Sequence, residues 1–134
     1  MDIEFAKGAF IMQGIEIEKK YKVKNLPKDL EFYKKIEIEQ AYLNHGCKPT
    51  LRLRKYNDDK YILSYKSRKK EYTDNLSVCD EIELDLSKES YEHLKEKIDG
   101  RVIHKTRYII PLDDGLKVEI DRFNTSIKSF RIFF

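Results

Sequence analysis

Residues 14–24 read Gly-Ile-Glu-Ile-Glu-Lys-Lys-Tyr-Lys-Val-Lys, a stretch in which apolar and charged side chains alternate at nearly every step. Such alternation is the pattern of a β-strand that buries one face and keeps the other polar. The same pattern recurs in residues 35–44, 50–56, 60–66, 78–86, 102–111 and 116–123. These seven predicted strands are within the range that small β-barrels use.

The composition and the turns favour antiparallel strands. The 134 residues include only three alanines against fifteen isoleucines and nine tyrosines, a balance typical of sheets rather than of long helices. Short turn sequences rich in Asn, Asp and Gly follow the alternating segments at residues 45–46, 57–59 and 113–115. We therefore expect consecutive strands to be joined as hairpins.

Two segments predict short helices instead. Residues 27–34 place Pro27 in a first helical turn, and residues 87–98 offer Ser87 as an N-cap. No linker, long repeat or low-complexity segment divides the chain. We expect one α+β domain over residues 1–134 that is mainly antiparallel β, with a few flanking helices.

Charge and hydropathy exclude several classes of protein. The formal net charge is only +3, too small for a general nucleic-acid coat, so we expect no specific nucleic acid as a partner. Apolar runs reach four or five residues, far short of the ~20 that span a bilayer, so we expect no membrane association. The two cysteines, Cys47 and Cys79, form neither a disulfide framework nor a metal-binding pair, which favours the reducing cytoplasm.

The charged residues of the predicted strands are sorted by sign. Pairs of like charge recur two residues apart, and so on one face of a strand: Glu16 and Glu18, Arg52 and Arg54, Glu81 and Glu83, Lys105 and Arg107, Glu119 and Asp121. A solvated sheet face with opposite charges on neighbouring strands is one interpretation. However, like charges at this spacing repel, and a face selected only for solubility would mix signs within each strand.

The alternative interpretation turns the charged faces inward. If the sheet closes, acids line some walls of a tunnel and arginines and lysines line others, and buried charges persist only when they are paired or coordinate a ligand. Guanidinium groups match phosphate oxygens, whereas carboxylates are the ligands that Mg²⁺ and Mn²⁺ prefer. The pattern therefore predicts a polyphosphate bound together with a divalent cation.

The order of these charged motifs resembles that of the CYTH domain superfamily, also called the triphosphate tunnel metalloenzymes. Residues 16–20 resemble its ExExK signature, and further blocks follow in the family's order. These blocks are Asn25-Leu26-Pro27, Ile38 to Leu43 as I-x-Q-x-Y-L, Arg52-Leu53-Arg54, Lys66, Glu81-Ile82-Glu83, Lys105-Thr106-Arg107 and Glu119-Ile120-Asp121. The spacing is most similar to that of the small bacterial-type triphosphatases.

The resemblance implies a closed or nearly closed antiparallel β-barrel whose tunnel binds triphosphate and Mg²⁺ or Mn²⁺. It implies three sets of site residues. Phosphate oxygens would be held by Lys20, Arg52, Arg54, Lys66, Lys105 and Arg107. Metal would be held by Glu16, Glu18 and Asp121, with Glu81, Glu83 and Glu119 as further ligands or supporting acids. Glu16, Glu18 and Lys20 would form the catalytic group.

The resemblance implies metal-dependent hydrolysis of inorganic triphosphate or of another triphosphate-containing small molecule. Two alternatives stay open: an adenylate cyclase of the class that this family includes, and a catalytically weak module that binds polyphosphate or nucleotide. Thiamine triphosphatases are further members of the family.

Both ends of the sequence depart from the family pattern. The expected final Glu-x-Glu strand is replaced from about residue 124 by a stretch without acids, so we expect a truncated or altered last strand and weakened catalysis. A missing strand would leave a seam able to pair with another chain, so we expect a monomer or a homodimer. Residues 1–11 precede the first motif and are expected to be a leader without chemistry.

Overall fold

A computed structural model describes the backbone of residues 2–6, 9–22, 25, 27–73, 76–123 and 128–133, and the side chains of residues 14, 25, 27–68 and 78–123. Within these residues it contains nine strands, one 3₁₀ turn and one α-helix. The strands are β1 Asp2–Ala6, β2 Ala9–Lys22, β3 Lys34–Tyr42, β4 Thr50–Tyr56, β5 Lys60–Thr73, β6 Leu76–Leu86, β7 Asp99–Pro111, β8 Lys117–Phe123 and β9 Lys128–Phe133. The 3₁₀ turn is η1 Leu30–Phe32 and the helix is α1 Lys88–Lys95.

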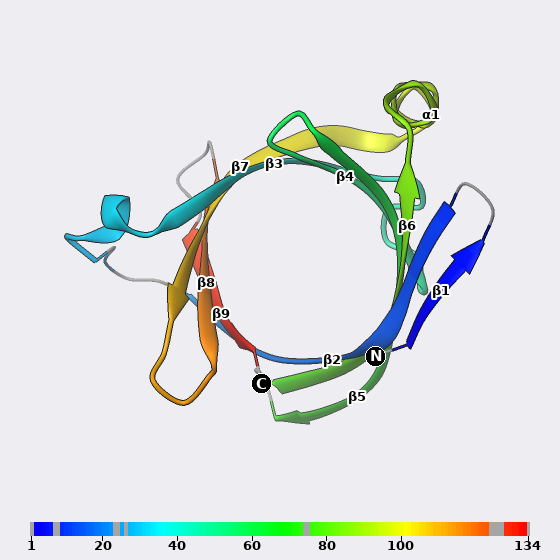
Figure 1. The fold of residues 1–134 in the computed structure, drawn as a ribbon. Helices are drawn as coiled ribbons and strands as arrows, with labels where there is room; N and C mark the ends of the chain where they lie inside the picture. The colour runs from blue at the N-terminus through cyan, green and yellow to red at the C-terminus, as the bar shows by residue number, and fades with distance from the viewer. Residues whose placement is uncertain are drawn as a thin grey trace.

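All the strands belong to one antiparallel sheet, which confirms the mainly antiparallel β class. Their order is β1-β2-β6-β5-β4-β3-β7-β8-β9. Strand β9 pairs with β8 on one side and with β2 on the other, so the order from β2 to β9 returns on itself. Figure 1 shows these eight strands encircling a common axis, and we call them the ring. The expectation of an open seam was therefore wrong, because residues 128–133 form a strand that pairs on both sides.

The predicted strands all occur, and two local predictions need correction. The helix predicted over residues 27–34 is only the three-residue turn η1, because Lys34 already pairs with β7 as the first residue of β3. Ser87 does cap α1, since its Oγ accepts the backbone N–H of Ser90 at 3.0 Å. The helix ends at Lys95 with Glu96 as its C-cap, three residues short of the predicted end at residue 98. Strand β1 and the start of β2 lie in the segment expected to be a leader.

Apolar packing lies outside the ring. Leu30 of η1 packs on Tyr108 and Ile120, and Figure 1 shows η1 and α1 on the outer side of the strands. Since successive residues of a strand point to opposite faces, the neighbouring Arg107 and Asp121 belong to the inner face. Both are nevertheless buried, at 7% and 2% exposure. On β7 and β8, the outer face thus buries apolar groups and the inner face buries charged groups.

The cluster under η1 should contribute measurably to stability. Leu30 is 4% exposed and Phe32, two residues away, is 91% exposed. Leu30→Ala should therefore lower the free energy of unfolding by about 2–5 kcal/mol, because it leaves a cavity beside Tyr108 and Ile120. The matched variant Phe32→Ala should change it by less than about 0.5 kcal/mol. Urea unfolding of both variants measures the difference, and equal effects would contradict the packing described here.

Candidate active site

The strand register places the predicted site residues on the same face. Residues directly opposite each other in an antiparallel pair project from one face of the sheet. Arg54 lies opposite Gln40, Lys66 opposite Glu81, and Arg107 opposite Asp121. Followed around the ring, this face carries the register positions of Glu16, Glu18, Lys20, Arg52, Arg54, Lys66, Glu81, Glu83, Lys105, Arg107, Glu119 and Asp121. The side chains of Glu16, Glu18 and Lys20 lie outside the described residues.

The strand order separates the two signs of charge. Three strands carry most of the predicted cations: β5 and β4, which are adjacent, and β7, which is separated from β4 by β3. The strands that carry the predicted acids, β8, β2 and β6, are neighbours except for β9. We call these halves the basic arc and the acidic arc. Lys20 on β2 is the one predicted cation in the acidic arc, at a register position opposite Arg131 of β9.

The cations of β7 are held by the acids of β8. Arg107 Nε donates to Asp121 Oδ1 at 2.8 Å, and Arg107 Nη2 donates to Asp121 Oδ2 at 3.0 Å. Lys105 Nζ also donates to Asp121 Oδ2, at 2.8 Å, and Arg107 Nη1 lies 3.2 Å from Glu119 Oε1. Burial disfavours the charged guanidinium, but the hydrogen bonds and charge of Asp121 outweigh burial and raise the pKa of Arg107.

The arginines of β4 are buried, and within the described side chains neither forms an ion pair with a carboxylate. Arg54 donates from Nε to Gln40 Oε1 at 3.1 Å and from Nη1 to Tyr56 Oη at 3.3 Å, and both acceptors are neutral. Arg52 is 9% exposed, and its buried Nε has no hydrogen-bond partner within the part of the chain that the structure describes. Burial, followed by the like charge of Arg54, lowers the pKa of Arg52 to about 10. The β4 pair is therefore a buried positive site that an anion would stabilise.

The sequence motifs missed the groups that hold Arg54. Gln40 falls within the motif of residues 38–43, but its amide had been given no role. The structure shows that its Oε1 accepts from Arg54 while its Nε2 lies 3.4 Å from Tyr42 Oη. The signal that could have found it is a polar residue on the strand face that otherwise carries Ile36 and Ile38. Gln40 and Tyr56 thereby fix one cation of the basic arc.

The acidic arc offers oxygen donors suited to a hard divalent cation. Glu119 and Asp121 are both buried on β8, and carboxylates are the donors that Mg²⁺ and Mn²⁺ prefer. Among the described residues, no group of three or more His, Cys, Asp or Glu side chains is arranged to hold a metal ion. The donor chemistry of the arc fits the cation, and a full ligand set would also have to draw on Glu16 and Glu18.

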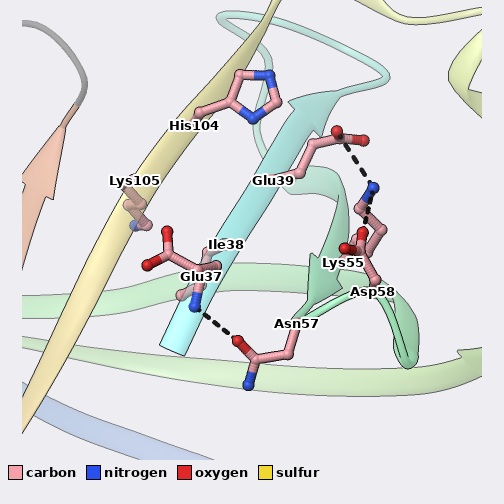
Figure 2. A pocket seen from close by; sticks show the side chains of 8 residues that line it. All are labelled: Glu37, Ile38, Glu39, Lys55, Asn57, Asp58, His104 and Lys105. Carbon is pink, nitrogen blue, oxygen red and sulfur yellow. Dashed lines mark hydrogen bonds and ion pairs between the residues drawn. The ribbon is translucent and has the colours of Figure 1, made fainter. Parts of the chain in front are cut away.

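A second pocket region, beside the contacts that hold α1, is lined mainly by charged and polar side chains. Figure 2 shows it between β3, β7 and the β4–β5 turn, with Glu39 joined to Lys55 and Lys55 to Asp58. His104, which alternation predicts to face away from the inner face, lines this pocket. Glu39 also accepts from Tyr91 Oη at 3.0 Å and lies 2.7 Å from Lys95 Nζ, and both partners belong to α1. These contacts dock α1 on the ring.

Similarity to a known protein family and to solved structures identifies the family of this chain. The family model of the CYTH domain matches residues 14–128, and the chain belongs to this family. The inorganic triphosphatase NE1496 is 27% identical with a TM-score of 0.59, over 89% of this chain and 73% of that one. No curated protein matches the chain.

Two more distant structures share the fold. A candidate adenylyl cyclase from Hippeastrum, HpAC1, which has a dominant triphosphatase activity, is 16% identical with a TM-score of 0.67, over 89% of this chain and 79% of that one. The PH1012 protein from Pyrococcus horikoshii is 23% identical with a TM-score of 0.66, over 88% and 77%. In the described part of this chain, no helix has the length and apolar character needed to cross a membrane.

The contacts of Glu39 predict an acid-sensitive step in stability. Burial alone would raise the pKa of Glu39, but the hydrogen bonds from Lys95 and Tyr91 and the charges of Lys95 and Lys55 outweigh it, so the pKa is lowered. A carboxyl group with a lowered folded-state pKa contributes stability above its unfolded pKa, and this contribution is lost as pH falls through the folded pKa.

Glu39→Gln should therefore lower the free energy of unfolding at pH 7 by about 1–3 kcal/mol and flatten its decline below pH ~4.5. Urea unfolding across this pH range measures both effects. Glu92→Gln removes an exposed carboxylate from the same helix and serves as the control. A decline below pH ~4.5 that is equally steep with Gln at position 39 would contradict this assignment.

Proposed function

We propose that this chain is a divalent-metal-dependent hydrolase of inorganic triphosphate or a related triphosphate, with the inner face of the ring as its tunnel. The observation that carries the proposal is the β4 pair, two buried guanidinium groups that form no ion pair among the described residues, with the charge of Glu81 only partly offsetting the burial of Arg52. A protein keeps such a site at a cost in stability, and a polyanion offsets that cost when it binds. The inorganic triphosphatase NE1496, at 27% identity, supports the choice of substrate class.

The basic arc suits an extended phosphate chain. Arg52 and Arg54 offer planar guanidinium groups that contact phosphate oxygens in pairs, and Lys66 offers a compact charge on the adjacent strand β5. Lys105 and Arg107 extend the arc on the other side of β3. We assign phosphate binding to these five residues and to Lys20. A neutral ligand would leave the β4 pair uncompensated, which is why we exclude it from the proposal.

The acidic arc is the proposed metal side of the tunnel. Glu16, Glu18 and Asp121 are the proposed ligands of Mg²⁺ or Mn²⁺, and Glu81, Glu83 and Glu119 are further ligands or supports. When bound, a divalent cation neutralises charge on the phosphate oxygens and lowers the pKa of a coordinated water.

The protein's own contribution to hydrolysis is positioning and charge. The cations of the basic arc hold the phosphate chain in line with the attacking water, and they stabilise the negative charge that builds up on the leaving phosphate. Glu16, Glu18 and Lys20 of β2 form the proposed catalytic group. No nucleophilic side chain is required, because water attacks directly.

The cellular setting follows from simpler observations. Both cysteines are free, Cys47 exposed and Cys79 buried, which fits a reducing cytoplasm. The ring closes within one chain through β9, so the proposed tunnel needs no strand from a second copy, whether the protein is a monomer or a homodimer.

Product analysis tests the reaction class. Incubated with Mg²⁺ or Mn²⁺, the chain should convert inorganic triphosphate to orthophosphate and pyrophosphate, as followed by phosphorus NMR. Parallel incubations with ATP and thiamine triphosphate define the substrate range. Cyclic AMP from ATP would instead establish the cyclase alternative, and tight binding of triphosphate without turnover would establish the binding module. Failure to bind or convert any of the three would refute the proposal.

Two arginines should separate binding from stability. Arg52→Gln should weaken triphosphate binding roughly 10- to 100-fold, because it removes one charge-assisted contact. It should leave the free energy of unfolding unchanged or higher, because it removes a buried charge beside Arg54. Arg107→Gln should lower the free energy of unfolding by about 1.5–3 kcal/mol, because Asp121 loses its bidentate partner, although Lys105 still pairs with it. Calorimetry and urea unfolding measure the two quantities, and the opposite ranking of stability would contradict the described contacts.

A further inference from the structure

The buried cations of the inner face occur in two different electrostatic states. On β4, Arg52 and Arg54 form no ion pair among the described residues, and Arg54 is held only by neutral groups. On β7, Arg107 makes two hydrogen bonds to Asp121 and an ion pair with Glu119. The planar guanidinium therefore already has, in a carboxylate, the bidentate oxygen partner that a phosphate group would supply. The difference between the strands predicts different availability for an anion.

We infer that Asp121 acts as an internal competitor of triphosphate for Arg107, and that a divalent cation bound to Asp121 makes Arg107 available. This inference rests on the proposed function and adds to it an order of engagement. Without metal, triphosphate binds through the β4 pair. With metal, the carboxylate of Asp121 turns to the cation and Arg107 turns to a phosphate oxygen.

The burial of Arg107 and Asp121 requires that a change of partners keep both charges compensated. Asp121 is 2% exposed and Arg107 is 7% exposed, so neither group gains water when it loses the other. Asp121 would keep Lys105 and Arg107 would keep Glu119, but each would lose its bidentate contact in a buried site, which is costly. New partners for both groups therefore favour the exchange. Metal on the carboxylate and phosphate on the guanidinium supply these partners together. Each ligand therefore raises the affinity for the other, by the same factor for both.

The competitor can be removed without adding metal. Asp121→Asn keeps the size of the side chain but lacks the charge that holds Arg107. In the presence of EDTA, this variant should bind inorganic triphosphate about tenfold more tightly than the parent chain, a change of the size expected for one charge-assisted hydrogen bond. Isothermal titration calorimetry measures the affinity. Working without metal also avoids the binding of triphosphate to free metal in solution.

Two control variants separate this mechanism from a general change in charge. Glu37→Gln removes the same unit of charge from an exposed position on β3, and should leave the affinity within about twofold, since exposed charges are screened. The double variant Asp121→Asn with Arg107→Gln should lose most of the gain, because the gain requires the released guanidinium; any gain that remains measures Lys105, which Asp121→Asn also releases. A gain that persists in full in the double variant, or an equal gain in Glu37→Gln, would overturn the inference.

The outcome distinguishes this inference from the proposed function. If the parent chain binds no triphosphate with or without Mg²⁺, the proposed function fails and the inference fails with it. If the parent binds triphosphate and Asp121→Asn binds it no more tightly, only the inference fails. If Asp121→Asn does not fold, as judged by circular dichroism, Glu119→Gln decides instead, since Glu119 also pairs with Arg107. For Glu119→Gln, a gain in metal-free affinity that is smaller than the one expected for Asp121→Asn supports the inference, and no gain overturns it.

Discussion

Repulsion between two buried guanidinium groups, Arg52 and Arg54, is the constraint around which the inner face is organised. Their positions two residues apart on β4 place both on one face, and burial keeps solvent from screening them. Of the groups near them, Gln40, Tyr42 and Tyr56 are neutral, and the negative charge of Glu81 only partly offsets the burial of Arg52. The strand order keeps the carboxylates of β8 on the far side of β3 and β7. The site therefore retains an unbalanced positive charge that a polyanion is suited to neutralise.

Apolar packing on the outer face offsets the free-energy cost of burying charged groups on the inner face. Leu30, Tyr108 and Ile120 form an apolar cluster on one side of the ring, and Tyr91 of α1 packs against Tyr61 with ring centroids 5.1 Å apart. Burial of such groups supplies the favourable free energy that the inner face does not. The outer face thus contributes apolar packing, whereas the β4 arginines of the inner face are the groups proposed to bind the ligand. Substitutions on the two faces should accordingly have separable effects.

Local sequence patterns predicted the parts of the structure that depend on neighbours in the chain. The alternation in residues 50–56 predicts β4, and Ser87 predicts the start of α1, because both signals act within a few residues. The helix prediction for residues 27–34 was wrong, although a proline and acidic residues favour a helix start there. Of the residues in η1, only Leu30 is buried against the apolar cluster, so no longer helix is stabilised. The shared face of the like-charged pairs was also predictable, since alternation fixes faces. The roles of those residues stay predictions.

Contacts between distant segments were out of reach of such patterns. The separation into basic and acidic arcs depends on the order of strands in the sheet, which residues 119 and 121 do not reveal by themselves. Glu39 and Tyr91 meet across 52 residues of sequence, and no spacing rule connects them. The family resemblance supplied a list of cations, but it did not show that Arg107 is held by Asp121 while Arg52 is not. These differences become visible only when side chains are placed in three dimensions.

The most direct measurement is a crystal structure of the chain grown with inorganic triphosphate and Mn²⁺, whose anomalous scattering locates the metal. We predict phosphate density inside the ring in contact with the guanidinium groups of Arg52 and Arg54, and an anomalous peak beside Asp121. Triphosphate bound only on the outer surface, with the inner face unchanged, would contradict the assignment of this face as the triphosphate site.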